Sequence, residues 1–169
     1  YVAQKAHMFK GSIQSNICFG KPDASDEEMV HAATVAQASD FISKREHGYL
    51  DEIAEDGTNI SGGQKQRLSI ARVILKKPSL YIYDDSFSAL DFKTDAKLRE
   101  ALAASCKETK STVLLVAQRI SSILHADQII VLDEGKIVGK GTHAELMKSC
   151  DVYQQIASSQ LTKEELANV

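Results

Sequence analysis

The feature that most constrains the fold of this chain is the stretch at residues 59–67, which reads Asn-Ile-Ser-Gly-Gly-Gln-Lys-Gln-Arg. Ser61 followed three residues later by Gln64 is a capping box, which predicts that a helix begins here. Gly62 and Gly63 leave the N–H groups of the first helical turn uncovered by side chains. The positive end of the helix macrodipole lies at the same place, so the stretch predicts an anion-binding helix N-terminus.

The same helix is predicted to have one apolar face and a defined end. The apolar face consists of Leu68, Ala71 and Leu75. Pro78 stops the helix, and Lys65 and Arg67 add positive potential near its start. An ordinary capped helix with a glycine-rich start is the alternative interpretation of this segment taken alone.

The segment at residues 80–85 supports the interpretation of the helix start as an anion-binding site. Residues 80–83 are an apolar run that predicts a buried strand, and Asp84 and Asp85 follow it directly. In α/β folds, ligands bind at the carboxyl ends of strands. Two adjacent acids can also be a helix cap or a solvated turn. Their position behind four apolar residues, downstream of the glycine-containing helix start, indicates a ligand site instead.

The order of the other elements indicates an α/β fold. Residues 12–77 are predicted to be mainly helical, without a convincing strand and with helices at 25–38 and 41–44. Further predicted strands are at 112–116, 128–132 and 136–138. Further predicted helices are at 91–106, from the capping box of Thr142 and Glu145 onward, and at 151–161. Strand–helix–strand order with fully apolar strands implies a parallel sheet with both faces covered.

Composition excludes several classes of protein. The net charge is −3 with both signs interspersed, so we expect no nucleic-acid-binding surface. The longest apolar runs, such as 112–117, have the length of strands and are too short to span a bilayer. Cys18, Cys106 and Cys150 match neither a zinc site nor a disulfide framework, and we expect reduced thiols.

Residues 59–67 and 80–85 together resemble the signature motif and the Walker B strand of an ATP-binding cassette (ABC) ATPase. The resemblance runs from Gln4 to about Leu161, and residues 131–143 are typical of bacterial multidrug-type exporters. It implies an α/β fold, namely a partial P-loop NTPase core with a mainly parallel sheet and a helical signature subdomain. The expected divisions are a Q-loop region at 1–11, the helical signature subdomain at 12–77, the C-terminal part of the ATPase core at 78–161 and a tail at 162–169.

The resemblance also implies a role for each candidate site residue. Asp84 is expected to hold Mg²⁺, and Asp85 to polarise the water that attacks ATP. Gln4, as the Q-loop glutamine, is expected to reach both the Mg²⁺ and that water. The signature residues expected to contact the ATP of a neighbouring domain are Ser61, Gly62, Gly63 and Gln64. The D-loop at the interface between two such domains is expected to include Ser88 and Asp91, and the switch region to include Gln118.

Two positions depart from the family pattern, and both affect the same composite site. Asp85 stands where active members carry Glu; a carboxylate one methylene shorter reaches about 1.5 Å less, and misplacement on that scale can cost about 10²-fold in rate. Gln118 stands where the family has His, and glutamine cannot carry a proton at neutral pH. The signature is intact apart from Ile60 in place of Leu. This asymmetry predicts the degenerate-site subunit of a heterodimer.

The function implied by the resemblance is that of an ATPase domain, with ATP and Mg²⁺ as cofactors, that drives export of a drug-like or lipophilic substrate. The implied partners are a second ABC subunit and the transmembrane domain of the same polypeptide, at the cytoplasmic face of the membrane. A non-transport ABC ATPase of the DNA-repair or chromosome-maintenance type is the rival hypothesis. It is disfavoured because the helical region lacks the sustained heptads of a long coiled coil.

The chain is interpreted as a piece of a longer polypeptide. Residues 1–4 read as the end of a strand, and no segment matches Gly-x-x-x-x-Gly-Lys-Ser/Thr, the phosphate-binding Walker A motif, which we expect upstream of Tyr1. By itself, such a piece is expected to hydrolyse essentially no ATP and to be at most a non-catalytic interaction module. It is also expected to expose apolar sheet surface and to self-associate.

Overall fold

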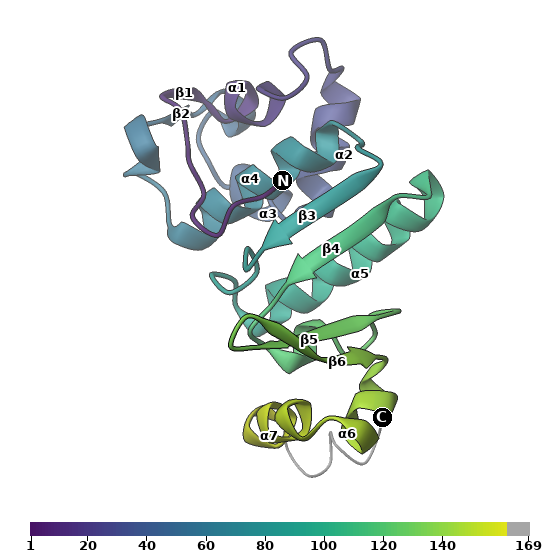
Figure 1. Ribbon diagram of the computed structural model, residues 1–169. Coiled ribbons are helices and arrows are strands. Elements are labelled where there is room, and N and C mark those ends of the chain that lie inside the picture. Colours follow the sequence, from purple (N-terminus) through teal and green to yellow (C-terminus); the bar gives the residue numbers. More distant parts are fainter. Residues whose placement is uncertain (162–169) are drawn as a thin grey trace. The chain divides into compact units, whose positions relative to one another are not determined.

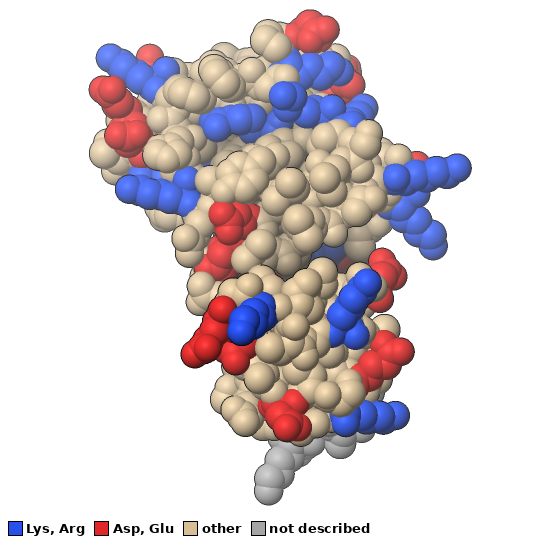
Figure 2. All heavy atoms as spheres, viewed as in Figure 1, with Lys and Arg blue, Asp and Glu red and all other residues tan. Residues whose placement is uncertain are grey.

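The computed structural model describes residues 1–161 (Figure 1). The predicted tail at 162–169 lies outside the described residues. The chain forms two compact units, the first from Tyr1 to Val116 and the second from Ala117 onward. No helix within residues 1–161 is both long enough and apolar enough to cross a bilayer. Acidic and basic side chains are mixed on the visible face of each unit (Figure 2).

The helical part of the first unit contains α1 (Ile13–Cys18), α2 (Asp26–Val35), α3 (Ser39–Ile42) and α4 (Gly62–Leu75). α2 begins at a capping box, in which Ser25 and Glu28 exchange side-chain and backbone hydrogen bonds. The helix predicted at 25–38 is shorter than expected. Gln37 has a φ of 57°, and this left-handed conformation separates α2 from α3. The helical segment predicted at 41–44 is found instead at 39–42, as α3.

Two short strands lie in the region that was predicted to contain none. β1 (Gly11–Ser12) pairs antiparallel with β2 (Glu52–Ile53), so the prediction for 12–77 is wrong on this point. Strands of two residues are too short for an alternation of apolar and polar residues to show in the sequence. The 3-10 helices η1 (Gly48–Leu50) and η2 (Glu55–Gly57) flank β2.

The apolar face predicted for α4 is confirmed. Leu68, Ala71 and Leu75 are fully buried, and they share one hydrophobic cluster with Tyr81 and Tyr83 of the following strand. The signature helix is therefore anchored in the same core as the strand that carries the two acids.

The centre of the first unit is a parallel strand pair. β3 (Leu80–Asp84) and β4 (Thr112–Val116) run side by side in the same direction, and α5 (Phe92–Thr109) connects them (Figure 1). Asp84 is in register with Val116, so the two strands end at the same edge. The parallel arrangement predicted from the strand–helix–strand order is confirmed for this pair.

The first residues of the chain lie along the other edge of β3. Val2 forms a parallel bridge with Tyr83, in which its N–H donates to the Ile82 carbonyl (2.8 Å) and its carbonyl accepts from the Asp84 N–H (3.0 Å). The strand end predicted at residues 1–4 is thus a single bridge. It fixes the path of the chain into Gln4.

The prediction that β4 is buried is wrong. Val113, Leu114 and Val116 are exposed, with 51% of Leu114 accessible. Successive side chains of a strand point to opposite faces, so both faces of β4 carry exposed apolar residues. The separate expectation that this chain exposes apolar sheet surface is confirmed by the same residues.

The second unit consists of η3 (Ile120–Ser122), an antiparallel hairpin and two helices. β5 (Ile129–Asp133) and β6 (Lys136–Gly141) are joined through Glu134 and Gly135, which have φ values of 45° and 75°. α6 (His143–Ser149) begins at the capping box of Thr142 and Glu145, and α7 (Asp151–Gln160) follows. The predicted strands, the capping box and the last helix are confirmed, although β6 runs to Gly141 and not only to 138.

The Tyr83 hydroxyl is a buried polar group without a hydrogen bond in residues 1–161. Tyr83 is fully buried, and its hydroxyl finds no hydrogen-bond partner among residues 1–161. Removing an unsatisfied buried polar group costs little or nothing, so Tyr83→Phe is a neutral change by this reasoning.

Glu28 joins three parts of the helical region. Its carboxylate accepts from Lys21 Nζ (2.5 Å), which follows α1, and from Lys77 Nζ (3.2 Å), which follows α4. It also accepts from the Ser25 N–H at the start of α2 (3.4 Å). These contacts, that of Lys21 first, lower the pKa of Glu28 from its ordinary 4.5 to about 2.

We expect Glu28→Gln to destabilise the fold at neutral pH, and the difference from the wild type to shrink as the pH falls from 4.5 to about 2. A carboxyl whose pKa is lowered by folding stabilises the fold while it is ionised, and this contribution is lost on protonation. Denaturant unfolding across this pH range measures the difference. Glu52→Gln is the matched control, since Glu52 is exposed and forms none of the ion pairs found in residues 1–161. A Glu28→Gln effect of equal size at neutral and acidic pH contradicts this account.

Candidate functional site

The candidate site begins at the carboxyl end of β3. Asp84 is half-buried, and Asp85 is buried with 8% of its surface exposed. Asp85 has a φ of 45°, and its N–H donates to the Val116 carbonyl (3.0 Å) at the end of β4. The two acids therefore lie where two parallel strands end together, as the sequence predicts.

Gln4 lies beside the second acid. Its amide Nε2 donates to Asp85 Oδ2 (3.0 Å), although 81 positions separate the two residues in the sequence. Gln4 and Asp85 were both selected from the sequence as candidate catalytic residues, and the fold brings them together. The amide oxygen of Gln4 takes no part in this bond.

The side chains at this edge suit a magnesium ion bound together with a nucleotide. Asp84 and Gln4 offer carboxylate and amide oxygens, the hard donors that Mg²⁺ takes. Within residues 1–161, no cluster of three or more His, Cys, Asp or Glu residues could hold a metal without further ligands. Mg²⁺ in nucleotide sites is held by one or two carboxylates together with phosphate oxygens and waters, so this small donor set fits.

Tyr1 also lies at the site, although no motif in the sequence indicates it. The Tyr1 hydroxyl donates to Asp84 Oδ2 (2.7 Å), and this hydrogen bond is the main reason why the pKa of Tyr1 is raised. Only the predicted strand character of residues 1–4 could have indicated that Tyr1 lies near β3.

The tip of α4 has the predicted capping geometry. Ser61 Oγ accepts from the Gln64 N–H (3.2 Å), and Gln64 Oε1 accepts from the Ser61 N–H (2.9 Å). The N–H groups of Gly62 and Gly63 are not used by this capping box. Ser61 and Gly62 are exposed, so the helix N-terminus is accessible to an anion.

The signature tip packs against the candidate D-loop. A Cβ added at Gly63 would lie 3.3 Å from the Ala89 carbonyl oxygen, whereas a Cβ at Gly62 would meet nothing within 4 Å. Ser88 Oγ donates to the Asp85 carbonyl (2.8 Å), which joins this loop to the strand-end acids.

Asp91, one of the two predicted D-loop residues, is the N-cap of α5. Its carboxylate accepts from the Thr94 N–H (3.0 Å) and from the Thr94 hydroxyl (2.7 Å). These two contacts, the backbone one first, lower the pKa of Asp91.

Gln66, which no motif in the sequence marks as a site residue, joins α4 to the start of the chain. Gln66 is 2% exposed, and its Nε2 donates to the Ala3 carbonyl (3.2 Å) next to Gln4. The sequence offered only a weak signal for this role, because Gln66 is a polar residue close to the apolar face of α4 that includes Leu68. Gln66 thus holds the backbone that carries Gln4 against the signature helix.

Gln118 belongs to the second unit, whereas the other candidates lie in the first. Its carbonyl accepts from Gln160 Nε2 (2.8 Å), and Gln160 Oε1 accepts from the Ile120 N–H (2.8 Å). The Gln160 side chain of α7 therefore forms two hydrogen bonds with the backbone of the predicted switch region, at Gln118 and at Ile120.

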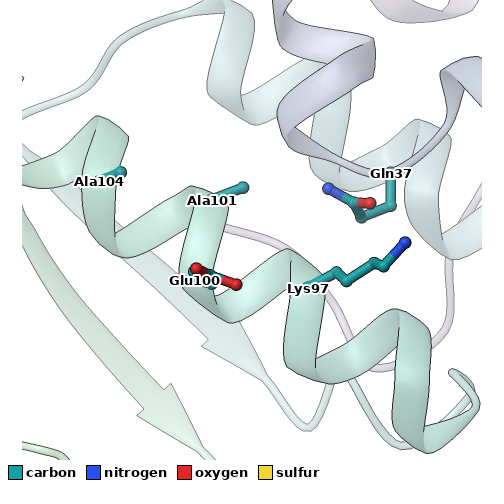
Figure 3. Close-up of a pocket in the computed structure, with 5 residues that line it drawn as sticks. All are labelled: Gln37, Lys97, Glu100, Ala101 and Ala104. Carbon is teal, nitrogen blue, oxygen red and sulfur yellow. The ribbon is translucent and has the colours of Figure 1, made fainter.

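The hollow shown in Figure 3 is separate from these residues. It is lined by Gln37, Lys97, Glu100, Ala101 and Ala104, with Lys97 pointing toward Gln37. None of the candidate site residues lines it, so it is not the proposed nucleotide site.

An α/β core with acids at the end of a parallel strand and a capped, glycine-containing helix start is the arrangement of an ABC-type ATPase domain, and comparison with known proteins agrees. The sequence model of the family described as "ABC transporter" matches residues 1–88. The chain therefore belongs to the ABC transporter family.

Individual relatives give the same assignment. The chain is 43% identical over 164 residues to an uncharacterized ABC transporter ATP-binding protein, YfiB, of Bacillus subtilis. The alignment covers 97% of this chain and 28% of that protein. It is 45% identical over 159 residues to a putative multidrug export ATP-binding/permease protein of Staphylococcus aureus, covering 94% and 27%. The chain thus spans little more than a quarter of the length of these relatives.

A solved structure confirms the predicted ABC ATPase fold. The structure of a bacterial Atm1-family ABC exporter with ATP bound matches with a TM-score of 0.89 and 34% sequence identity. The match covers 96% of this chain and 28% of that chain.

We expect Gly62→Ala to be at least as stable as the wild type, and Gly63→Ala to be less stable than Gly62→Ala by about 1 kcal/mol or more. Replacing a helical Gly by Ala stabilises by roughly 0.5–1 kcal/mol. The new methyl at position 63, unlike that at 62, crowds the Ala89 carbonyl, and overpacking of this kind costs about 1–3 kcal/mol. Chemical denaturation of the two variants provides the comparison. Equal stabilities would show that the signature tip does not pack on this loop.

Proposed function

We propose that this chain is the ATP-binding domain of an ABC exporter and that it couples ATP binding and hydrolysis to export of a drug-like or lipophilic substrate. The observation that carries the proposal is the hydrogen bond from Gln4 to Asp85, beside Asp84 at the end of β3. It joins two residues that the family motifs select independently, 81 positions apart in the sequence. The names of the relatives support the export function.

The proposed division of labour follows from the chemistry of the side chains. Asp84 and Gln4 hold Mg²⁺, which neutralises phosphate charge when it is bound with ATP. Asp85, held by Gln4, orients the attacking water. The N–H groups at the α4 tip, Gly62 and Gly63, donate to the terminal phosphate of an ATP molecule carried by a second domain, where the helix dipole favours negative charge.

We further propose that this chain forms the degenerate site of a heterodimer. Asp85 and Gln118 both weaken the site to which this chain supplies the Walker B acids, whereas the signature residues 61–64 are intact. This domain therefore contributes a working signature to its partner's site and a slow site of its own. Its other partner is the transmembrane domain of the longer polypeptide, which places it at the cytoplasmic face of the membrane.

The rival functions are less well supported. The relatives named above are transporters or exporters, which disfavours a non-transport ABC ATPase of the DNA-repair type. The 169 residues contain no Walker A motif, so by itself this stretch is proposed to bind ATP poorly and to be inactive.

The degenerate site can be tested in the intact polypeptide that contains this chain, purified without a second subunit. We expect slow ATP hydrolysis, and an increase of about 10²-fold in Asp85→Glu combined with Gln118→His, because the longer carboxylate and the imidazole restore the positions that the chemistry requires. Adding Asp84→Asn to this variant is the control and is expected to abolish the gain. Rapid hydrolysis by the unmodified subunit alone would contradict the degenerate-site proposal.

A further inference from the structure

Asp84, the first of the two acids at the end of β3, forms a hydrogen bond with Tyr1. Tyr1 Oη donates to Asp84 Oδ2 at 2.7 Å, across 83 positions of sequence. Tyr1 is 67% exposed, so its ring is not held in this place by burial in the core. The contact between Tyr1 and Asp84 is a hydrogen bond made by an exposed side chain.

The backbone determines this contact. Val2 and Tyr83 are bridged and both point into the core, with exposures of 1% and 0%. Side chains alternate along extended backbone, so Tyr1 and Asp84 lie on the opposite face of the same pair of segments. A tyrosine at this position reaches diagonally to the end of β3, as cross-strand neighbours do.

The same short segment holds both acids. Tyr1 donates to Asp84 and Gln4 donates to Asp85, each through one side-chain hydrogen bond. Between them, the Val2 carbonyl accepts from the Asp84 N–H (3.0 Å) and from the buried Ser86 hydroxyl (3.1 Å). Residues 1–4 therefore contact both acids at the end of β3, and also the backbone between them.

We propose that Tyr1 is a positioning residue for the magnesium acid. Its hydrogen bond to Oδ2 fixes the Asp84 carboxylate in one orientation, and in that orientation Asp84 would hold the hydrated metal. Hydrogen bonds to a carboxylate are short and strong, and groups that orient metal-binding carboxylates typically change metal affinity when removed. This inference rests on the proposed function, because it needs a nucleotide-bound metal at Asp84.

The test is a titration of Mn²⁺, an EPR-visible substitute for Mg²⁺, into the intact transporter in the presence of a non-hydrolysable ATP analogue. We expect Tyr1→Phe to weaken Mn²⁺ binding at the site of this chain by about 10-fold or more. Tyr83→Phe is the matched control, since it removes a tyrosine hydroxyl one residue from Asp84 that has no hydrogen-bond partner in residues 1–161. This control is expected to leave Mn²⁺ affinity unchanged.

The outcomes separate this inference from the function on which it rests. Mn²⁺ affinity of Tyr1→Phe equal to or tighter than that of the wild type would overturn the positioning role while leaving the proposed function intact. A wild-type transporter with no nucleotide-dependent Mn²⁺ binding at the site of this chain would overturn the metal role of Asp84 itself. A loss of affinity in Tyr1→Phe alone, with an unchanged unfolding midpoint, supports the proposal.

Discussion

The candidate site depends on the bridge between Val2 and β3. Two backbone hydrogen bonds fix the first residues of the chain along the edge of that strand. From this position Gln4 reaches Asp85 and Tyr1 reaches Asp84. Because the bridge sets the register, a shift of one residue would turn all of these side chains to the other face.

The α4 helix connects the two functions proposed for this domain. Its tip is capped by Ser61 and Gln64 and is accessible to an anion, while its side holds the Ala3 carbonyl through Gln66. Its apolar face is buried in the same cluster as β3. The helix that makes the proposed contact with a second domain's ATP therefore also packs on the strand and the chain segment that carry the proposed metal site.

The sequence predicted the local features and the parallel pairing of β3 with β4, but not all of the hydrogen bonds between distant residues. Capping boxes such as that of Thr142 and Glu145 depend on residues three positions apart, so they can be recognised directly. The hydrogen bonds of Tyr1 and Gln66 join residues more than sixty positions apart and leave no periodic signal. The exposure of β4 was missed for a related reason, because an apolar run shows that a strand can be buried but not whether the described chain covers it.

The central claim is that the α4 tip of this chain binds the terminal phosphate of an ATP molecule held by a second domain. A structure of the intact transporter, trapped with a non-hydrolysable ATP analogue, tests this claim most directly. We predict that the terminal phosphate lies within about 3 Å of the backbone N–H groups at the start of α4. A trapped complex in which this helix start faces away from the nucleotide would contradict the account.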